Sequence, residues 1–187
     1  PPTTPLRSLA LRAHDPRHSR RQLVRPMKIH TNTPGGTIDN IYCAAKSDDQ
    51  VGEPVIGDLL EKMAVGFPFT VESAMRKDSL DMSDDDRTLI CKLAGDCAEE
   101  CVLITHGTDG MVKTALALQG ITGKRIVLTG ALQPAAFAIT DAIFNIGCAI
   151  GAVQSKPPGE YIAMNGEVFD AGTVRKNVEA NRFERLD

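Results

Sequence analysis

From residue 28 onward, short apolar runs alternate with longer segments in which apolar and polar positions recur at helical spacing. Segments with the length of parallel strands fall at 28–33, 69–73, 101–105, 125–129 and 161–164, and the run at 101–105 has the apolar composition of a buried one. Helical segments fall between them at 54–64, from 83 onward, at 110–119 and at 140–154, whereas the polar stretch 39–52 is predicted to be a long loop. This order predicts an α/β fold: a Rossmann-like or flavodoxin-like, mostly parallel sheet with helices on both faces, in a single domain.

Two local signals refine this pattern. Ser83 followed by three aspartates predicts a helix start, because a hydroxyl caps free backbone N–H groups and acids suit the positive end of the helix dipole. The first strand is unusual, since Thr31, Asn32 and Thr33 make it more polar than a central parallel strand should be.

Composition limits the class of protein. The chain has 187 residues and 42% hydrophobic content, enough for one well-buried domain and too little for two large ones. The net charge of -3, with mixed signs, predicts neither nucleic acid nor membrane as a partner. No apolar stretch approaches the about 20 residues that span a bilayer, and 142–153 is predicted to be a core helix.

The N-terminal segment differs from the rest. Residues 1–26 contain six arginines and a single acid, Asp15. An Arg-rich, acid-poor segment is typical of transit peptides, but we favour a basic extension outside the fold, with the domain at 27–187.

Cysteine and histidine usage indicates a reduced setting without a metal. The five cysteines form no C-x-x-C pair, which favours a cytoplasmic protein with free thiols. None of the four histidines falls in a cluster with metal-ligand spacing, so we expect no metal and no cofactor.

Candidate chemistry lies in two turns that each follow a predicted strand. Thr108 and Asp109 follow the 101–105 strand directly, and ligands of open α/β sheets collect at the carboxyl ends of the strands. Upstream, Gly35 and Gly36 permit close approach of a ligand and leave Thr37 at the rim. Neither turn has the spacing of a dinucleotide-binding or P-loop motif.

Six motifs, taken together and in order, resemble the L-asparaginase/glutaminase family of bacterial amidohydrolases. They are Pro-Gly-Gly-Thr-Ile at 34–38, Asp-Ser-Leu-Asp-Met at 78–82, His-Gly-Thr-Asp at 106–109, Leu-Thr-Gly-Ala-Leu-Gln-Pro at 128–134, Met-Asn-Gly-Glu-Val at 164–168 and Val-Arg-Lys-Asn at 174–177. The resemblance covers about residues 27–184 and implies a short-chain form that lacks the family's C-terminal domain.

The resemblance implies catalytic roles for five residues. It gives first attack on the side-chain amide of L-asparagine to Thr37, which forms an acyl-enzyme that water hydrolyses to L-aspartate, and it groups Thr108 with Asp109 and Lys176. Burial can lower the pKa of a lysine enough for it to act as a base. Asp49 aligns with the tyrosine that assists the first threonine in longer members, so Tyr42 is the candidate substitute; packing is the alternative role for it.

The resemblance also implies how the substrate is held. Ser79 contacts the α-carboxylate and Asp109 the α-ammonium, and the remaining substrate-binding candidates are Gly36, Gly107 and Thr108. Family members form dimers and tetramers, so we expect a homodimer or homotetramer.

Three departures from the family pattern keep a second class of function open. Pro34 removes a backbone N–H, Leu80 stands where many members carry glutamine, and Gly110 replaces the usual threonine at the start of the helix. These changes favour a catalytically impaired protein that binds a small amino acid or amide, whereas the retained threonines, aspartate and lysine favour an enzyme. A hydrolase of another small amide is a related alternative, and a nucleotide-binding Rossmann domain is a distant third.

Overall fold

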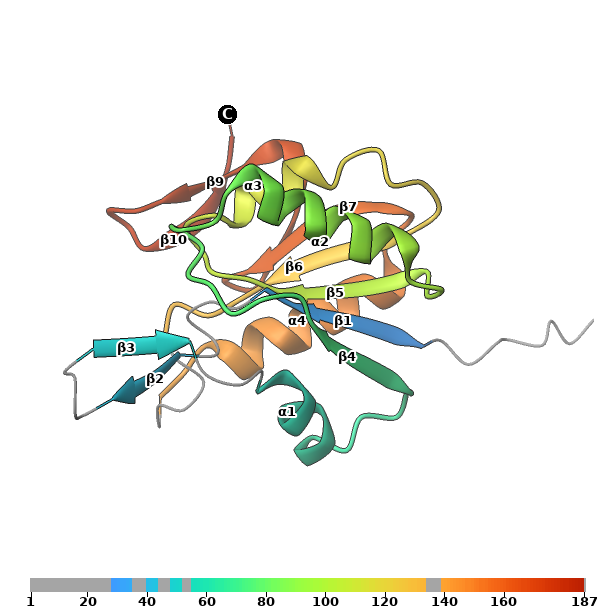
Figure 1. The fold of residues 1–187 in the computed structure, drawn as a ribbon, viewed down its shortest axis with the longest axis horizontal. Coiled ribbons are helices and arrows are strands. Elements are labelled where there is room, and N and C mark those ends of the chain that lie inside the picture. Colours follow the sequence, from blue (N-terminus) through green and yellow to red (C-terminus); the bar gives the residue numbers. More distant parts are fainter. Residues whose placement is uncertain (1–27, 35–39, 44–47, 52–54, 134–138, 187) are drawn as a thin grey trace, which may run out of the picture.

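The computed structural model describes residues 28–34, 40–43, 48–51, 55–133 and 139–186. Its main element is a six-stranded sheet, drawn in Figure 1. The strand order is β4-β1-β5-β6-β7-β8, with all neighbours parallel except β8, which pairs antiparallel with β7. The strand bounds are β1 Ile29–Thr33, β4 Phe69–Ser73, β5 Cys101–Thr105, β6 Arg125–Thr129, β7 Gly159–Met164 and β8 Glu167–Asp170. The predicted mostly parallel α/β fold is therefore confirmed.

Helices cover both faces of this sheet, as the sequence predicted (Figure 1). Residues of α2 and α3 pack in one apolar cluster, and residues of α1 and α4 pack in a second cluster on the opposite face. The helix bounds are α1 Ile56–Lys62, α2 Asp84–Asp96, α3 Met111–Ala117 and α4 Ala142–Ser155.

Strand β5 shows why the sheet needs two layers of helices. Successive side chains of a strand point to opposite faces. Val102 and Ile104 accordingly join the cluster of α2 and α3, whereas Cys101 and Leu103 join the cluster of α1 and α4. All five residues of the strand are buried, which is the continuous apolar pattern that the sequence shows there.

Strand β1 is central despite its polar sequence. It lies between β4 and β5, and its Thr31 and Thr33 are fully buried. Thr33 Oγ1 donates a hydrogen bond to the carbonyl oxygen of Glu72, and His30 Nδ1 lies 3.1 Å from Thr70 Oγ1. Polar contacts to β4 thus accompany the burial of this strand.

Two short hairpins complete the fold. One is formed by β2 Asn40–Cys43 and β3 Asp48–Val51, and the other by β9 Val174–Asn177 and β10 Arg182–Arg185, after a 3-10 turn at Ala171–Thr173. The prediction of a continuous loop over 39–52 is wrong. Strand β3 reads Asp-Asp-Gln-Val, a composition depleted in strands, and it forms by backbone pairing with β2.

The start of α2 shows the predicted cap. Ser83 Oγ accepts a hydrogen bond from the backbone N–H of Asp86, and the Asp86 carboxylate accepts one from the Ser83 N–H at 2.7 Å. Lys77 Nζ donates to the same carboxylate at 2.7 Å, and that hydrogen bond is the main cause that lowers the pKa of Asp86 to about 2. The capping box therefore also ties the segment before α2 to the helix.

We expect Ser83→Ala to lower the free energy of unfolding by about 1 kcal/mol, because the substitution removes the acceptor for the Asp86 N–H. Urea denaturation measures this change. Ser155→Ala is the control, since Ser155 Oγ bonds an exposed carbonyl at the end of α4, and its loss should cost far less. Equal losses in the two variants would contradict the capping role.

Candidate active site

Those predicted site residues that the structure places lie where the parallel strands end. Thr108 and Asp109 follow β5 and directly precede α3, and Ser79 lies in the loop between β4 and α2. The loop after β6 joins the same edge, because the His106 N–H donates to the carbonyl oxygen of Thr129 at 2.8 Å. Loops from several strands therefore form one surface at the carboxyl edge of the sheet.

Lys176 reaches this edge from β9. Its Nζ donates to Thr108 Oγ1 at 2.8 Å and to Asp109 Oδ1 at 2.7 Å. The Lys176 side chain is 14% exposed and that of Asp109 is 41% exposed. Side chains that are 67 and 68 positions apart in the chain thus form one group, with a buried hydroxyl, a nearly buried ammonium and a carboxylate open to solvent.

Ser79 packs directly against the loop that carries Thr108. A Cβ on Gly107 would lie 2.5 Å from Ser79 Oγ, and one on Gly110 would lie 2.8 Å from the Ser79 carbonyl oxygen. At Gly110, which replaces the family's usual threonine, the absence of a side chain lets the backbone at Ser79 come close. The lack of a side chain at both glycines therefore allows the buried Ser79 to lie next to the loop of Thr108.

His106 fixes the turn from inside. Its ring is fully buried, with Nδ1 2.7 Å from the Gly107 carbonyl oxygen and Nε2 2.8 Å from Thr114 Oγ1 on α3. A carbonyl only accepts, so Nδ1 carries the proton and Nε2 accepts from the threonine hydroxyl. Burial lowers the pKa of His106 to about 4, which keeps the ring neutral near pH 7.

A second set of buried polar groups holds the loop after β6. Asn145, fully buried on α4, donates through Nδ2 to the Gly130 carbonyl oxygen and to Asp141 Oδ2. The Asp141 carboxylate also accepts from the N–H groups of Leu132 and Gln133. Sequence reasoning missed this network; the signal available was an asparagine within the otherwise apolar helix 142–153.

Three predicted residues are not placed by the structure. Gly36 and Thr37 lie outside the described residues, and only the backbone of Tyr42 is described, in β2. That backbone pairs directly with Asp49 of β3. Tyr42 and the position aligned with the family's tyrosine are therefore cross-strand neighbours.

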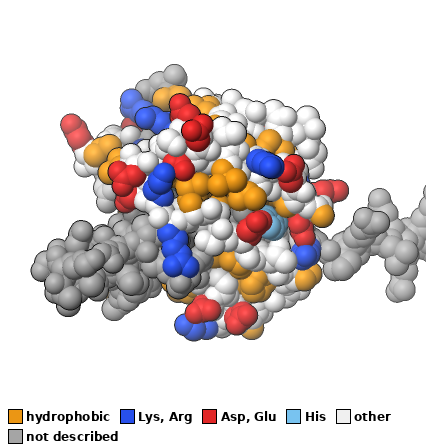
Figure 2. Space-filling model, in the orientation of Figure 1, with side chains coloured by type: hydrophobic (Ala, Val, Ile, Leu, Met, Phe, Trp, Pro, Cys, Tyr) orange, Lys and Arg blue, Asp and Glu red, His pale blue; other side chains and the backbone are white. Residues whose placement is uncertain are grey.

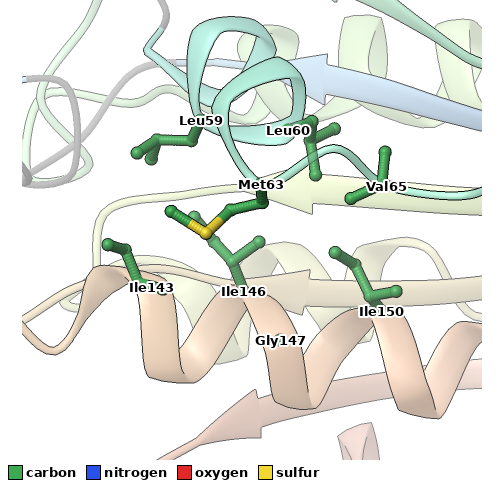
Figure 3. Close-up of a pocket in the computed structure, with 8 residues that line it drawn as sticks. All are labelled: Leu59, Leu60, Met63, Val65, Ile143, Ile146, Gly147 and Ile150. Carbon is green, nitrogen blue, oxygen red and sulfur yellow. The ribbon is translucent and has the colours of Figure 1, made fainter.

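A hollow elsewhere on the described residues has no chemistry of its own. It lies between α1 and α4, where Met63 faces Ile143 and Ile146 across the gap (Figure 3). Its lining is entirely apolar: Leu59, Leu60, Met63, Val65, Ile143, Ile146, Gly147 and Ile150. It offers no group that could activate or orient a polar substrate.

The rest of the described surface is mixed in charge. Figure 2 shows acidic and basic side chains interspersed on the viewed face. Within the described ranges, no three His, Cys, Asp or Glu side chains are grouped to hold a metal ion, and the four cysteines placed there are free thiols. No helix in the described part of the chain has the length and apolarity to cross a membrane.

These observations define a class of protein: a doubly wound α/β domain whose strand ends carry a hydroxyl, an ammonium and a carboxylate in hydrogen-bond contact. The family model described as "Asparaginase, N-terminal" matches residues 28–186. The chain belongs to this asparaginase family.

Individual relatives agree with this family. The chain is 37% identical over 82 residues to a glutaminase-asparaginase of Acinetobacter glutaminasificans, a match that covers 41% of this chain and 25% of the relative. It is 38% identical over 73 residues to one component of the glutamyl-tRNA(Gln) amidotransferase of Methanococcus vannielii, which covers 38% of this chain and 17% of the relative.

A solved structure shares the fold. The thermostable L-asparaginase from Thermococcus kodakarensis superposes with a TM-score of 0.72 at 24% identity, covering 86% of this chain and 51% of that one. The chain thus corresponds to about half of that protein's length.

We expect Gly107→Ala to lower the free energy of unfolding by about 1–3 kcal/mol, because its Cβ would overlap Ser79 in a packed loop junction. Equilibrium urea denaturation tests this. Gly151→Ala on α4 is the matched control: a Cβ there meets nothing within 4 Å, so the variant should be as stable as the parent or more so. Equal stability of Gly107→Ala and the parent would contradict the close contact.

His106 should make stability depend on pH. Because its pKa is about 4 when folded and 6.5 ordinarily, the unfolded chain binds more protons between those values. The neutral ring's contribution is complete above pH 6.5 and decreases as the pH falls toward 4, by about 1.4 kcal/mol per pH unit from this residue. His106→Gln, which stays neutral, should have a shallower stability profile between pH 4 and 6.5. Parallel profiles for parent and variant would rule out this titration.

Proposed function

We propose that this chain hydrolyses a side-chain amide, with L-asparagine as substrate and L-aspartate and ammonia as products. The observation that carries this proposal is the contact of Lys176 Nζ with both Thr108 Oγ1 and Asp109 Oδ1. A threonine hydroxyl becomes reactive when a base lies within hydrogen-bond reach, and Lys176 lies within that reach.

The reaction takes place in two steps. A threonine hydroxyl attacks the side-chain carbonyl carbon, a C–O ester bond forms, the C–N bond breaks and the hydroxyl proton leaves on ammonia. Water then attacks the ester, which releases aspartate and restores the hydroxyl. The family resemblance assigns the first attack to Thr37. We assign transfer of its proton through Thr108 to Lys176, which then passes the proton to the departing ammonia.

Substrate orientation follows from the charges at the site. Asp109 is partly exposed beside Lys176, so its carboxylate is open to the α-ammonium of an amino acid. Ser79, held against Gly107, is the proposed contact for the α-carboxylate. Pairing both substrate charges lowers the cost of removing them from water.

The names of the relatives indicate the range of substrates to consider. Their names include glutaminase-asparaginase and a component of an amidotransferase, and both glutamine and asparagine carry a side-chain amide. We propose asparagine as the preferred substrate and weaker hydrolysis of glutamine. The free thiols among the described cysteines support a cytoplasmic location.

The alternative is a protein on the same fold that binds a small amino acid without turnover. The contact of Lys176 with Thr108 favours the enzyme, because binding a ligand does not require an activated hydroxyl. The experiment below distinguishes the two.

We expect Lys176→Met to reduce ammonia release from L-asparagine by about a hundredfold or more, since it removes the proposed base. Lys113→Met is the matched control, because Lys113 is an exposed lysine on α3, and its activity should equal that of the parent. Thr37→Ala and Thr108→Ala, each followed by mass spectrometry of acid-quenched protein, identify which threonine carries the acyl group.

Calorimetric titration with L-aspartate completes this test. If the folded parent binds aspartate but releases no ammonia, the enzyme hypothesis is wrong and the binding-protein alternative holds. Turnover that survives in Lys176→Met would overturn the role of the lysine.

A further inference from the structure

Lys176 is not part of the six-stranded sheet. It lies on β9, which pairs only with β10 in a separate two-stranded sheet of the described chain. Its contacts with Thr108 and Asp109 therefore depend on what fixes this hairpin to the rest of the domain.

Side-chain hydrogen bonds join the two strands of the β9–β10 hairpin. Glu184 of β10 accepts hydrogen bonds from Asn177 and from Arg175, both on β9, and these bonds hold the pKa of Glu184 below its ordinary value, with that from Asn177 contributing most. Two strands joined in this way move together, so a shift of β10 carries β9 with it.

The hairpin packs on the domain through Val174 and Phe183 and pairs Arg185 with Glu167 of β8, and the Asn165 side chain adds a direct hydrogen bond. Asn165 Oδ1 accepts a hydrogen bond from the Phe183 N–H at 2.9 Å. Asn165 lies in the tight turn between β7 and β8, and its own N–H donates to Oδ1 of the buried Asn145. Asn165 thus links α4 and the sheet on one side to β10 on the other.

The register of the hairpin makes this link relevant to the site. Phe183 is the cross-strand partner of Lys176. Because the Phe183 N–H points outward to Asn165, the two residues form a non-hydrogen-bonded pair, whose Cα atoms are about 4.5 Å apart. The bond from Asn165 therefore holds the residue directly opposite the lysine.

The backbone conformation at position 165 limits which residues can supply this hydrogen-bond acceptor. The φ of Asn165 is +54° and that of Gly166 is +81°, which suits a two-residue hairpin turn. Asparagine, aspartate and glycine all tolerate such a left-handed conformation, but only the first two supply an acceptor oxygen.

We propose that Asn165 is a positioning residue: its amide oxygen fixes Phe183, and thereby places the Lys176 ammonium against Thr108 and Asp109. The catalytic consequence rests on the proposed function, whereas the placement of the lysine does not.

Two variants of Asn165 distinguish the role of its acceptor oxygen from the role of its backbone conformation in the turn. Asn165→Gly keeps the backbone conformation and removes the oxygen, and we expect it to lower kcat for ammonia release by about tenfold with a smaller change in KM. Asn165→Asp keeps an acceptor and should restore most of kcat. Asn181→Gly is the matched control, because Asn181 has φ +46° in the loop of the same hairpin.

A measurement that needs no turnover accompanies the kinetics. Partial acetylation by acetic anhydride, quantified by mass spectrometry, reports how accessible Lys176 is relative to the exposed Lys113. We expect acetylation of Lys176 to increase severalfold in folded Asn165→Gly and to stay at the parental level in Asn165→Asp and Asn181→Gly.

Unchanged acetylation and kcat in Asn165→Gly would overturn the proposal, as would an Asn165→Asp variant that behaves like Asn165→Gly. If the parent releases no ammonia, the proposed function fails and acetylation alone decides whether Asn165 positions the lysine.

Discussion

Burial of the central strands on both faces is the constraint on which the rest of this structure depends. Side chains of β5 alternate between the cluster of α2 and α3 and the cluster of α1 and α4, so neither layer of helices can be removed without exposing apolar surface. Because neighbouring strands from β4 to β7 run parallel, their carboxyl ends meet at one edge of the sheet. The same requirement that forms the core brings the loops of Ser79, Thr108 and Gly130 together.

At that edge, close backbone packing and buried polar groups replace apolar contacts. The missing side chains of Gly107 and Gly110 let the Ser79 loop approach, and neutral His106 bonds both its neighbour's carbonyl and Thr114. Asn145 performs the same task for the loop after β6. Both of these buried side chains have partners at each end, which makes the geometry specific, because a shifted loop would leave their donors or acceptors unsatisfied.

The sequence predicted the strands that fill the core well, and failed where strands form for other reasons. Strand β5 is identified by its apolar run, and Ser83 by its cap chemistry. Strand β3, with two aspartates and a glutamine, has no hydrophobic signal in the sequence, although its backbone pairs with that of β2. Strands β9 and β10 were missed because they have little apolar signal: their exposed positions carry arginine, and only Val174 and Phe183 are buried in the core.

The sequence by itself determined the α/β class, the turn that carries Thr108 and Asp109, and, through resemblance, the choice of Lys176 as their partner. These follow from local composition and from motifs read in order. Tertiary structure alone decided that the Lys176 ammonium lies 2.8 Å from Thr108 and that Asn165 bonds Phe183, the residue opposite the lysine. Contacts between residues far apart in the chain depend on hairpin register and on the packing of separate sheets, and no local pattern specifies either.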